Sequence, residues 1–237
     1  MSVKTSISWA DITINPITGC NNNCEYCYAR KMAYRLKGRF GYPADEPFRP
    51  TFHPDKVWQI ANLGGAGKRV FLDSMGDWFS PGVEKNWISA ILDTVHRRPQ
   101  HTFLVLTKRP DNIPEGLRWP ENLWMGVSVT CQDDVWRIDE LVHNSPLPGG
   151  SYLFVSFEPL HGPIEADLTG IGWVICGAES GNRKGKIIPE LKWVKKIARD
   201  ANHLGISVFI KNNLQELYRQ QPGCLGGVQE FPEAMKR

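Results

Sequence analysis

Three cysteines stand close together near the start of the sequence, in the stretch GCNNNCEYCYAR. Cys20, Cys24 and Cys27 lie within eight positions, and no fourth cysteine is near them. Such a group of thiols could form a disulfide, bind zinc or bind an iron–sulfur cluster. The three positions would also share one helix face, but Gly19 and the three asparagines at 21–23 are poor helix formers. The stretch therefore predicts a loop whose thiols bind a metal.

Zinc and an iron–sulfur cluster make different demands on the rest of the chain. A structural zinc site takes four protein ligands, commonly from two C-x-x-C pairs, and a second pair is missing here. His53 or His161 would have to come from far along the chain, and Cys131, Cys176 and Cys224 are isolated from one another. A 4Fe–4S cluster has four irons, each usually capped by one thiolate, so three thiolates leave one iron open. An open iron can bind a substrate or cosubstrate, which favours a reactive cluster over zinc or a simple electron carrier.

The composition indicates a globular, cytoplasmic protein. Of the 237 residues, 41% are hydrophobic, and nine Trp and ten Phe supply a core. The opening MSVKTSISWADITI lacks a signal-peptide pattern, and no apolar run approaches membrane-spanning length. We therefore expect a reducing cytoplasm and no membrane partner. The net charge of +3 is too small to argue alone for nucleic acid.

Short apolar runs alternate along the chain with amphipathic stretches. The runs are nearly continuous in hydrophobicity, as expected of strands buried on both faces. Strand–helix alternation of this length predicts a parallel α/β fold, either a barrel-like or an open sheet. The expected strands are Ile12–Asn15, Arg69–Asp73, Thr102–Thr107, Leu123–Val129, Tyr152–Phe157, Trp173–Cys176 and Ser207–Ile210.

Four helices are expected between these strands. Pro54 suits the first turn of one helix, and Asp133 and Asp134 suit the start of another. The apolar residues of each helix recur at three- and four-residue spacing, which indicates one buried face. The expected buried faces are Val57, Ile60 and Ala61; Ile88, Ile91, Leu92 and Val95; Val135, Ile138 and Val142; and Leu191, Val194, Ala198 and Ala201.

Polar residues follow most of the expected strands at their carboxyl ends, where parallel α/β folds collect their chemistry. Strand ends are usually polar loops in any case, so this regularity supports a site without establishing one. The residues concerned are Cys20–Cys27, Asp73–Asp77, Lys108 and Arg109, Ser128–Cys131, Glu158, Gly177–Gly181 and Lys211–Asn213.

The motif C-x-x-x-C-x-x-C, with Tyr26 before the last cysteine, resembles the signature of the radical S-adenosylmethionine (SAM) superfamily. Segments such as LTKRPDNI, FVSFEPLHGPI and WVICGAESG resemble those of a small, phage-associated radical SAM family of unknown function over most of the chain. The resemblance implies one radical SAM domain over 1–237, with a cluster loop at 19–30 and a short C-terminal extension at 212–237. The implied fold is a partial (β/α)-barrel of about six to seven parallel strands with helices outside.

The resemblance also implies the cofactors and their chemistry. Cys20, Cys24 and Cys27 would ligate a 4Fe–4S cluster whose open iron chelates SAM. One electron would cleave SAM, and the resulting 5′-deoxyadenosyl radical would abstract hydrogen from a substrate. A flavodoxin- or ferredoxin-like protein would donate the electron.

Roles for other residues follow from the same resemblance. Tyr26 would lie against adenine, as would the strand of Ile175 and Gly177. The backbone of Ser74, Met75 and Gly76 would bind the methionine amino group, although the superfamily's terminal Glu is missing here. Ser128 and Thr130 would contact the ribose. Lys108 and Arg109 would pair with the SAM carboxylate or a substrate phosphate.

Cys131 and Cys176 are candidate hydrogen donors to a substrate radical because each ends an expected strand, although buried structural cysteines are the commoner case. Glu158 and Glu179 could accept substrate donors or form salt bridges. A second cluster built from Cys131, Cys176 and Cys224 is disfavoured, since their spacing is not compact.

Three substrate hypotheses remain open. Basic residues at 30–39 and 183–186, together with the many Trp, suggest nucleic acid or a nucleoside, modified or repaired as by the spore photoproduct lyases. The alternatives are a small metabolite or peptide, and a non-catalytic iron–sulfur protein that senses redox state or binds a partner.

Overall fold

The computed structural model describes residues 5–65, 67–147, 152–181, 183–219 and 227–236. Contacts divide the chain into two compact units, Met1–Trp124 and Met125–Arg237. Cys224 lies outside the described residues. That the whole chain forms one domain stays a prediction.

The first unit is built on three parallel strands. β1 (Ile12–Ile14) pairs with β4 (Arg69–Leu72), and β4 pairs with β5 (Thr102–Thr107). Ile14 lies opposite Leu72, and Phe71 opposite Leu104, so apolar side chains align across the sheet. The strands are almost wholly buried, as their continuous hydrophobicity predicted.

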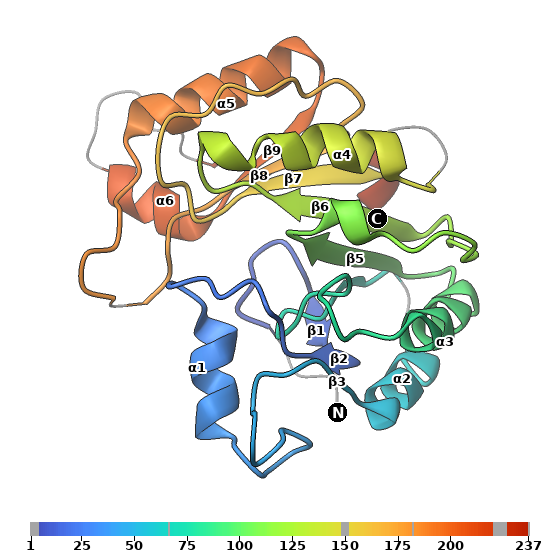
Figure 1. The fold of residues 1–237 in the computed structure, drawn as a ribbon. Helices are drawn as coiled ribbons and strands as arrows, with labels where there is room; N and C mark the ends of the chain where they lie inside the picture. Colours follow the sequence, from blue (N-terminus) through green and yellow to red (C-terminus); the bar gives the residue numbers. More distant parts are fainter. Residues whose placement is uncertain (1–4, 66, 148–151, 182, 220–226, 237) are drawn as a thin grey trace. The chain divides into compact units, whose positions relative to one another are not determined.

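Two helices pack side by side in this unit (Figure 1). α2 (Pro54–Ala61) has Pro54 in its first turn. Of its predicted buried face of Val57, Ile60 and Ala61, only Ile60 is fully buried. α3 (Lys85–His96) buries the predicted face of Ile88, Ile91, Leu92 and Val95. A short 3₁₀ helix, η1 (Pro110–Asn112), follows β5.

A segment that the sequence did not reveal separates β1 from α2. It begins with β2 (Ile17–Thr18) and ends with β3 (Thr51–Phe52), and these two-residue strands pair antiparallel. The helix α1 (Tyr28–Arg35) lies between them and away from α2 and α3 (Figure 1). The loop between β2 and α1, residues 19–27, carries Cys20, Cys24 and Cys27 and is called the cysteine loop below. It therefore follows β2, not the first parallel strand directly. Strands of two residues are too short to produce a periodic pattern in the sequence.

The second unit contains three parallel strands and most of a fourth, in consecutive order. β6 (Leu123–Ser128) pairs with β7 (Leu153–Phe157), β7 with β8 (Trp173–Cys176), and β8 with β9 (Ser207–Ile210). Trp173 is fully buried and contacts the rings of Phe154 and Phe209 at centroid distances of 5.7 and 6.1 Å. Gly126 leaves room for Phe154, because a Cβ there would lie 2.5 Å from the ring.

Helices α4 (Trp136–Asn144) and α5 (Leu191–His203) lie on the same side of these strands, α4 against β7 and α5 against β8 and β9 (Figure 1). α5 buries Val194, Ala198 and Ala201 as predicted, whereas the predicted Leu191 is only partly buried and Ile197 completes the face. The predicted face of α4 is partly wrong: Val142 is 40% exposed, and Leu141 takes its place beside Ile138. The unit also contains η2 (Gln132–Asp134), α6 (Asn212–Tyr218) and η3 (Glu233–Met235).

All the parallel strands were predicted to within one residue at each end. None of the helices that the structure describes has the length and apolar character needed to cross a lipid bilayer.

Candidate functional site

The cysteine loop is fastened by backbone hydrogen bonds to two other segments of the first unit. The Gly19 N–H donates to the Met75 carbonyl (2.9 Å), and the Asp77 N–H donates to the Gly19 carbonyl (3.3 Å). The Cys20 N–H donates to the Phe48 carbonyl (3.1 Å). The start of the loop thus lies between the segment after β4 and the segment before β3.

Gly19 is required at this crossing for two reasons. Its φ of +91° lies in the left-handed region that side chains disfavour. A Cβ at this position would also lie 2.1 Å from the carbonyl oxygen of Arg49. Only glycine lets the chain turn into the cysteine loop so close to another backbone.

The three thiols differ in their surroundings, although all three are free and partly buried. The Cys20 sulfur accepts the Asn22 N–H (3.4 Å), and the Cys27 sulfur caps α1 by accepting the Arg30 N–H (3.3 Å). The Cys24 thiol donates to the Asn22 carbonyl (3.9 Å). N–H donors to sulfur stabilise thiolates, and they tune the potential of iron–sulfur clusters.

Burial raises the pKa of the Cys20 thiol to about 11, with a further contribution from the Asp77 carboxylate and smaller ones from Cys24 and Cys27. The metal-free protein therefore holds Cys20 as a neutral thiol at physiological pH. A metal that binds there must displace this proton.

The described residues contain no group of three His, Cys, Asp or Glu side chains arranged to hold one metal ion. A zinc-like centre would need its ligands to converge on one point. A cubane cluster differs in this respect, because each thiolate caps a different iron. Three thiols in one anchored loop are therefore ligands of the kind that an iron–sulfur cluster takes. The described residues do not form a site for a single metal ion.

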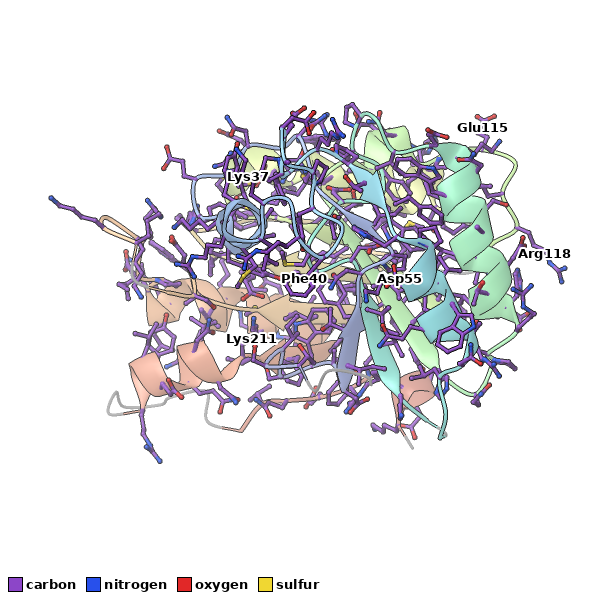
Figure 2. The ribbon with its side chains drawn as sticks, turned by 90° about the horizontal axis from the view of Figure 1, so that it is seen from below. Lys37, Phe40, Asp55, Glu115, Arg118 and Lys211 are labelled. Atoms are coloured by element: carbon purple, nitrogen blue, oxygen red, sulfur yellow. The ribbon has the colours of Figure 1, made fainter. Side chains whose placement is uncertain are left out.

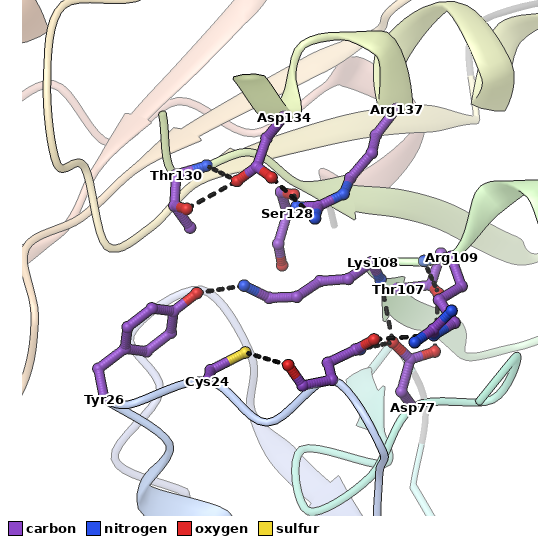
Figure 3. A network of polar contacts seen from close by, with 11 residues as sticks. Cys24, Tyr26, Asp77, Thr107, Lys108, Arg109, Ser128, Thr130, Asp134 and Arg137 are labelled. Atoms are coloured by element: carbon purple, nitrogen blue, oxygen red, sulfur yellow. Dashed lines mark hydrogen bonds and ion pairs between the residues drawn. The ribbon is translucent and has the colours of Figure 1, made fainter. Parts of the chain in front are cut away.

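Asp77 connects the cysteine loop to the carboxyl end of β5 (Figure 3). Its Oδ1 accepts the Thr107 hydroxyl (2.7 Å) and the Phe79 N–H (3.1 Å). Its Oδ2 accepts the Asn22 side-chain amide (2.9 Å) and the Lys108 N–H (3.0 Å). The side chain is buried, so these four donors replace the water that an ionised carboxylate would otherwise bind.

Lys108 and Tyr26, two predicted cofactor contacts, meet in the structure (Figure 3). The Lys108 ammonium donates to the Tyr26 hydroxyl and lies 4.8 Å from the centre of the ring. Arg109 donates from Nε to the Asn22 side-chain carbonyl (2.8 Å). The end of β5 thus places two cations beside the cysteine loop.

The segment of Ser74, Met75 and Gly76 also lies against this loop, but several of its polar groups already have partners. The Asn15 side-chain carbonyl accepts both the Ser74 hydroxyl and the Met75 N–H, each at 3.1 Å. The Tyr28 hydroxyl donates to the Ser74 carbonyl (2.6 Å). A methionine amino group would have to compete with these internal bonds.

Candidate residues of the second unit form a separate network around η2. The Asp134 carboxylate accepts the Thr130 N–H (2.9 Å) and hydroxyl (2.7 Å), and it forms an ion pair with Arg137 (2.7 Å). Arg137 also donates to the Ser128 carbonyl (2.9 Å). The Thr130 hydroxyl, a predicted ribose contact, therefore already donates a hydrogen bond to Asp134 (Figure 3).

The ends of β7, β8 and β9 bring together a second group of candidates. Glu158 forms an ion pair with Lys211, and both side chains are mostly buried. A Cβ at Gly177 would lie 2.7 Å from the Glu158 carboxyl carbon, so the glycine makes room for that side chain. Ile175 is fully buried within β8.

The remaining candidates of this unit, Glu179, Cys176 and Cys131, have different partners and different degrees of burial. Glu179 pairs through both its oxygens with Arg183, at 2.7 and 2.8 Å. Cys176 is fully buried, and burial, with a contribution from Glu158, raises its pKa to about 12. Cys131 is partly exposed before η2.

Several residues that organise the cysteine loop could not be recognised from the sequence. Asn22 bridges Asp77 and Arg109, and the Asn21 N–H and side chain bond to Ser80 and Pro81. These asparagines had been interpreted only as poor helix formers. Their amides could have been recognised as hydrogen-bonding groups, but their partners lie more than 50 residues away.

Comparison with solved structures identifies the fold class. A mutant of spore photoproduct lyase with dinucleoside spore photoproduct matches with a TM-score of 0.52 and 10% identity, over 89% of this chain and 78% of that one. Spore photoproduct lyase complexed with the same compound gives 0.50 and 11%, with the same coverage. A third lyase chain, with a TM-score of 0.49 and 12% identity, is matched over 89% of this chain, which spans only 58% of its length. The predicted α/β fold class, a partial barrel of parallel strands with outer helices, is confirmed.

The family of the chain follows from a second comparison. A family model described as a protein of unknown function, DUF5131, matches residues 4–221, so the chain belongs to that family. A search of the curated proteins finds no match. The predicted association with phages stays a prediction.

Proposed function

We propose that this protein is a radical SAM enzyme whose 4Fe–4S cluster is held by Cys20, Cys24 and Cys27. The observation on which the proposal rests is the anchored loop of three partly buried thiols, two of which accept backbone N–H bonds. The confirmed fold class and the cysteine spacing support it. Three thiolates leave one iron without a protein ligand, as SAM binding requires.

When bound, the cluster would supply one electron to cleave SAM and so produce the 5′-deoxyadenosyl radical. The protein would contribute position and exclusion of water. Asp77 would hold the loop against β5 through Asn22. Arg30 would hold the middle of the loop to α1 by donating to the Cys24 carbonyl (2.8 Å).

The first unit offers several groups for SAM. We propose that Tyr26 contacts the adenine and that Lys108 attracts the carboxylate, since its ammonium lies beside Tyr26 and near the loop. Ser74, Met75 and Gly76 would bind the methionine amino group through whichever backbone groups Asn15 and Tyr28 leave available.

In the second unit, taken by itself, Ser128, Thr130, Ile175 and Gly177 stay proposed SAM contacts. The Thr130 hydroxyl would have to turn from Asp134 or accept a hydrogen bond while donating to it. Ile175 and Gly177 would contact the adenine through their main chain, since the Ile175 side chain is buried in the sheet.

We further propose nucleic acid or a nucleoside as the substrate. The solved lyases of similar fold are described with a dinucleoside spore photoproduct. The basic residues after the cysteine loop suit a phosphate-bearing substrate. A small metabolite or peptide is the alternative substrate, and a non-catalytic iron–sulfur protein is the alternative function.

The test is anaerobic reconstitution with iron and sulfide, followed by electron paramagnetic resonance with and without SAM. We expect a 4Fe–4S signal that changes when SAM is added, and 5′-deoxyadenosine after reduction. Deuterium from a labelled substrate should appear in the 5′-deoxyadenosine. Cys24→Ala should abolish both the signal and the product, whereas Asp93→Asn, an exposed change on α3, should alter neither.

Two results would contradict the proposal. A bound zinc ion, or a cluster indifferent to SAM, would exclude radical SAM chemistry. A SAM-responsive cluster that yields no 5′-deoxyadenosine with reductant would favour the non-catalytic alternative.

Cys131 and Cys176 remain proposed hydrogen donors. Cys131 has the access that such a step requires, and Cys176 does not unless the protein moves. If Cys131→Ala and Cys176→Ala leave the product unchanged during turnover, the proposal of a cysteine donor is wrong.

A further inference from the structure

An open groove runs along α1 directly after the cysteine loop. Its volume is about 690 Å³, and it is lined by Asn23, Arg30, Lys31, Tyr34 and Arg35. Four of these residues belong to α1, where positions three and four apart lie on the same face. The opposite face buries the small residues Ala29 and Ala33, which pack with Tyr42 and Phe48. The groove therefore belongs to the solvent face of an anchored helix.

This face has a concentrated positive charge. Arg30, Lys31 and Arg35 line the groove, and Lys37 and Arg39 follow in the next turn. Within the part of the chain that the structure describes, none of these five cations forms an ion pair. Arg30 and Arg39 donate only to neutral oxygens, those of Asn23 and Cys24 for Arg30 and that of Arg35 for Arg39. The positive charge is thus available to an anionic ligand.

Exposed aromatic rings alternate with these cations. Tyr28 is 54% exposed, Tyr34 is 59% exposed, and Phe40 on the turn after α1 is 79% exposed. Figure 2 labels Phe40 and Lys37 on this turn. Large aromatic side chains are usually more buried than this in a monomeric protein. Cations interleaved with exposed rings are characteristic of surfaces that bind single-stranded nucleic acid, where phosphates meet cations and unstacked bases lie on the rings.

We propose that this α1 surface, formed by the groove and the turn at 36–40, binds a single-stranded segment of nucleic acid. Lys31 and Arg35 would contact phosphates, and Tyr34 and Phe40 would stack with bases. A duplex keeps its base faces stacked inside, so exposed rings favour a single strand. The inference rests on the proposed function in taking the bound strand as substrate.

The position of the surface fits delivery of a substrate to the cysteine loop. The Arg30 guanidinium lines the groove and also bonds to the loop, at the Asn23 side chain and the Cys24 carbonyl. Cys27 caps the same helix. A strand that follows the groove towards the helix N-terminus therefore reaches the proposed cluster ligands.

The test is fluorescence anisotropy with a labelled mixed-sequence 12-nucleotide DNA or RNA and the purified full chain. The double variant Lys31→Glu/Arg35→Glu should bind at least tenfold more weakly. Two lost phosphate contacts should also reduce the slope of log Kd against log salt by about 1.4. The control Lys192→Glu/Arg199→Glu makes the same charge change on exposed positions of α5 and should alter affinity less than threefold.

A second pair of variants tests the stacking contribution. Tyr34→Ala should weaken binding about fivefold or more, the lower end of measured base–aromatic stacking. Trp58→Ala removes a ring that is 70% exposed on α2 and should leave the affinity unchanged. Circular dichroism of each variant confirms that the fold is retained.

Three outcomes would overturn the inference: no salt-dependent binding, equal losses in the controls, or stronger binding of a duplex. Reduced affinity for an acidic flavodoxin with unchanged oligonucleotide binding would also overturn it and assign the surface to a protein partner. The proposed function fails separately, through absence of 5′-deoxyadenosine from the wild-type protein. If the oligonucleotide still binds but no 5′-deoxyadenosine forms, the inference about the α1 surface is supported and the proposed function is wrong.

Discussion

At the residue scale, one carboxylate holds together the segments that form the candidate site of the first unit. Asp77 accepts two donors on each oxygen, from Asn22, Phe79, Thr107 and Lys108. No neutral side chain of the same shape can do this. The aspartate thus determines where the cysteine loop lies relative to β5.

Asp77→Asn tests this role. The asparagine NH₂ group would replace one carboxylate oxygen, and it cannot accept the two hydrogen bonds that this oxygen accepts. Each buried donor left unsatisfied costs about 1–3 kcal/mol. We expect a lower free energy of unfolding in urea and less iron per chain after reconstitution. Asp93→Asn on exposed α3 is the control. Equal iron loading in both variants would show that Asp77 does not position the loop.

A second buried carboxylate should make stability depend on pH. Burial raises the pKa of Asp73 well above its usual value, against the opposing effect of the Ile17 N–H and the Trp78 indole. The folded state then binds more protons than the unfolded state above about pH 4. Stability from this group is present below that pH and is lost as the pH rises towards the raised pKa.

Urea unfolding of the metal-free protein from pH 4 to 7.5 measures this dependence. Relative to Asp73→Asn, the wild-type protein should lose stability as the pH rises through this window. The difference between the two proteins isolates Asp73 from carboxylates whose pKa is lowered, such as Asp200 and Glu179, which act in the opposite direction. Parallel curves would contradict the assignment.

At the element scale, the β2–β3 pair and Gly19 determine how the cysteine loop and α1 leave the sheet. The short pair closes the segment that contains both, and Gly19 crosses the Arg49 carbonyl at its start. The loop is therefore positioned by its two ends as well as by Asp77.

Gly19→Ala tests the crossing, and Gly181→Ala is a matched control. Both glycines have a φ near +90°, but a Cβ at Gly181 meets nothing within 4 Å. The control should show only the backbone strain, roughly 1–3 kcal/mol. Gly19→Ala adds a collision with the backbone, so we expect a larger loss of stability and no iron loading. Similar melting temperatures for the two variants would contradict this explanation.

The same elements explain what could be predicted from the sequence. Strands buried on both faces produce continuous apolar runs, so Thr102–Thr107, Trp173–Cys176 and Ser207–Ile210 were predicted with their correct ends. β2 and β3 are stabilised by pairing with each other, which single-sequence periodicity does not detect. α1 was missed because only two of its residues, the small Ala29 and Ala33, are buried, so it lacks the face of large apolar residues that periodicity detects.

In the candidate site too, features that are local in sequence could be predicted, and contacts between distant residues could not. The cysteine spacing is local in sequence and could be interpreted directly. The contact between Tyr26 and Lys108 joins residues 82 positions apart, and both had been proposed from resemblance, but their mutual contact had not. The bond from Asn22 to Asp77 depends on a distant partner, so it could be found only in the fold.

At the scale of the whole molecule, each unit has its own hydrophobic core, independent of any metal. The rings of Trp9 and Phe71 pack 4.6 Å apart in the first unit, and Trp173 lies at the centre of an aromatic group in the second. The cysteine loop is held by bonds to Met75, Phe48 and Asp77. A chain of this size does not need a metal to bury enough apolar surface.

We therefore expect the metal-free protein to keep its fold, unlike small zinc domains that unfold without metal. Its far-UV circular dichroism should match that of the reconstituted protein. The proposed cluster should raise the melting temperature only as a ligand of the native state does, because binding to the folded chain shifts the equilibrium by mass action. If the three thiols share the proposed cluster, limited proteolysis without metal should cut first between residues 19 and 50, since that segment loses its ligand while both cores persist. Global unfolding on removal of iron would show that the cluster, not the two cores, maintains the structure around the site.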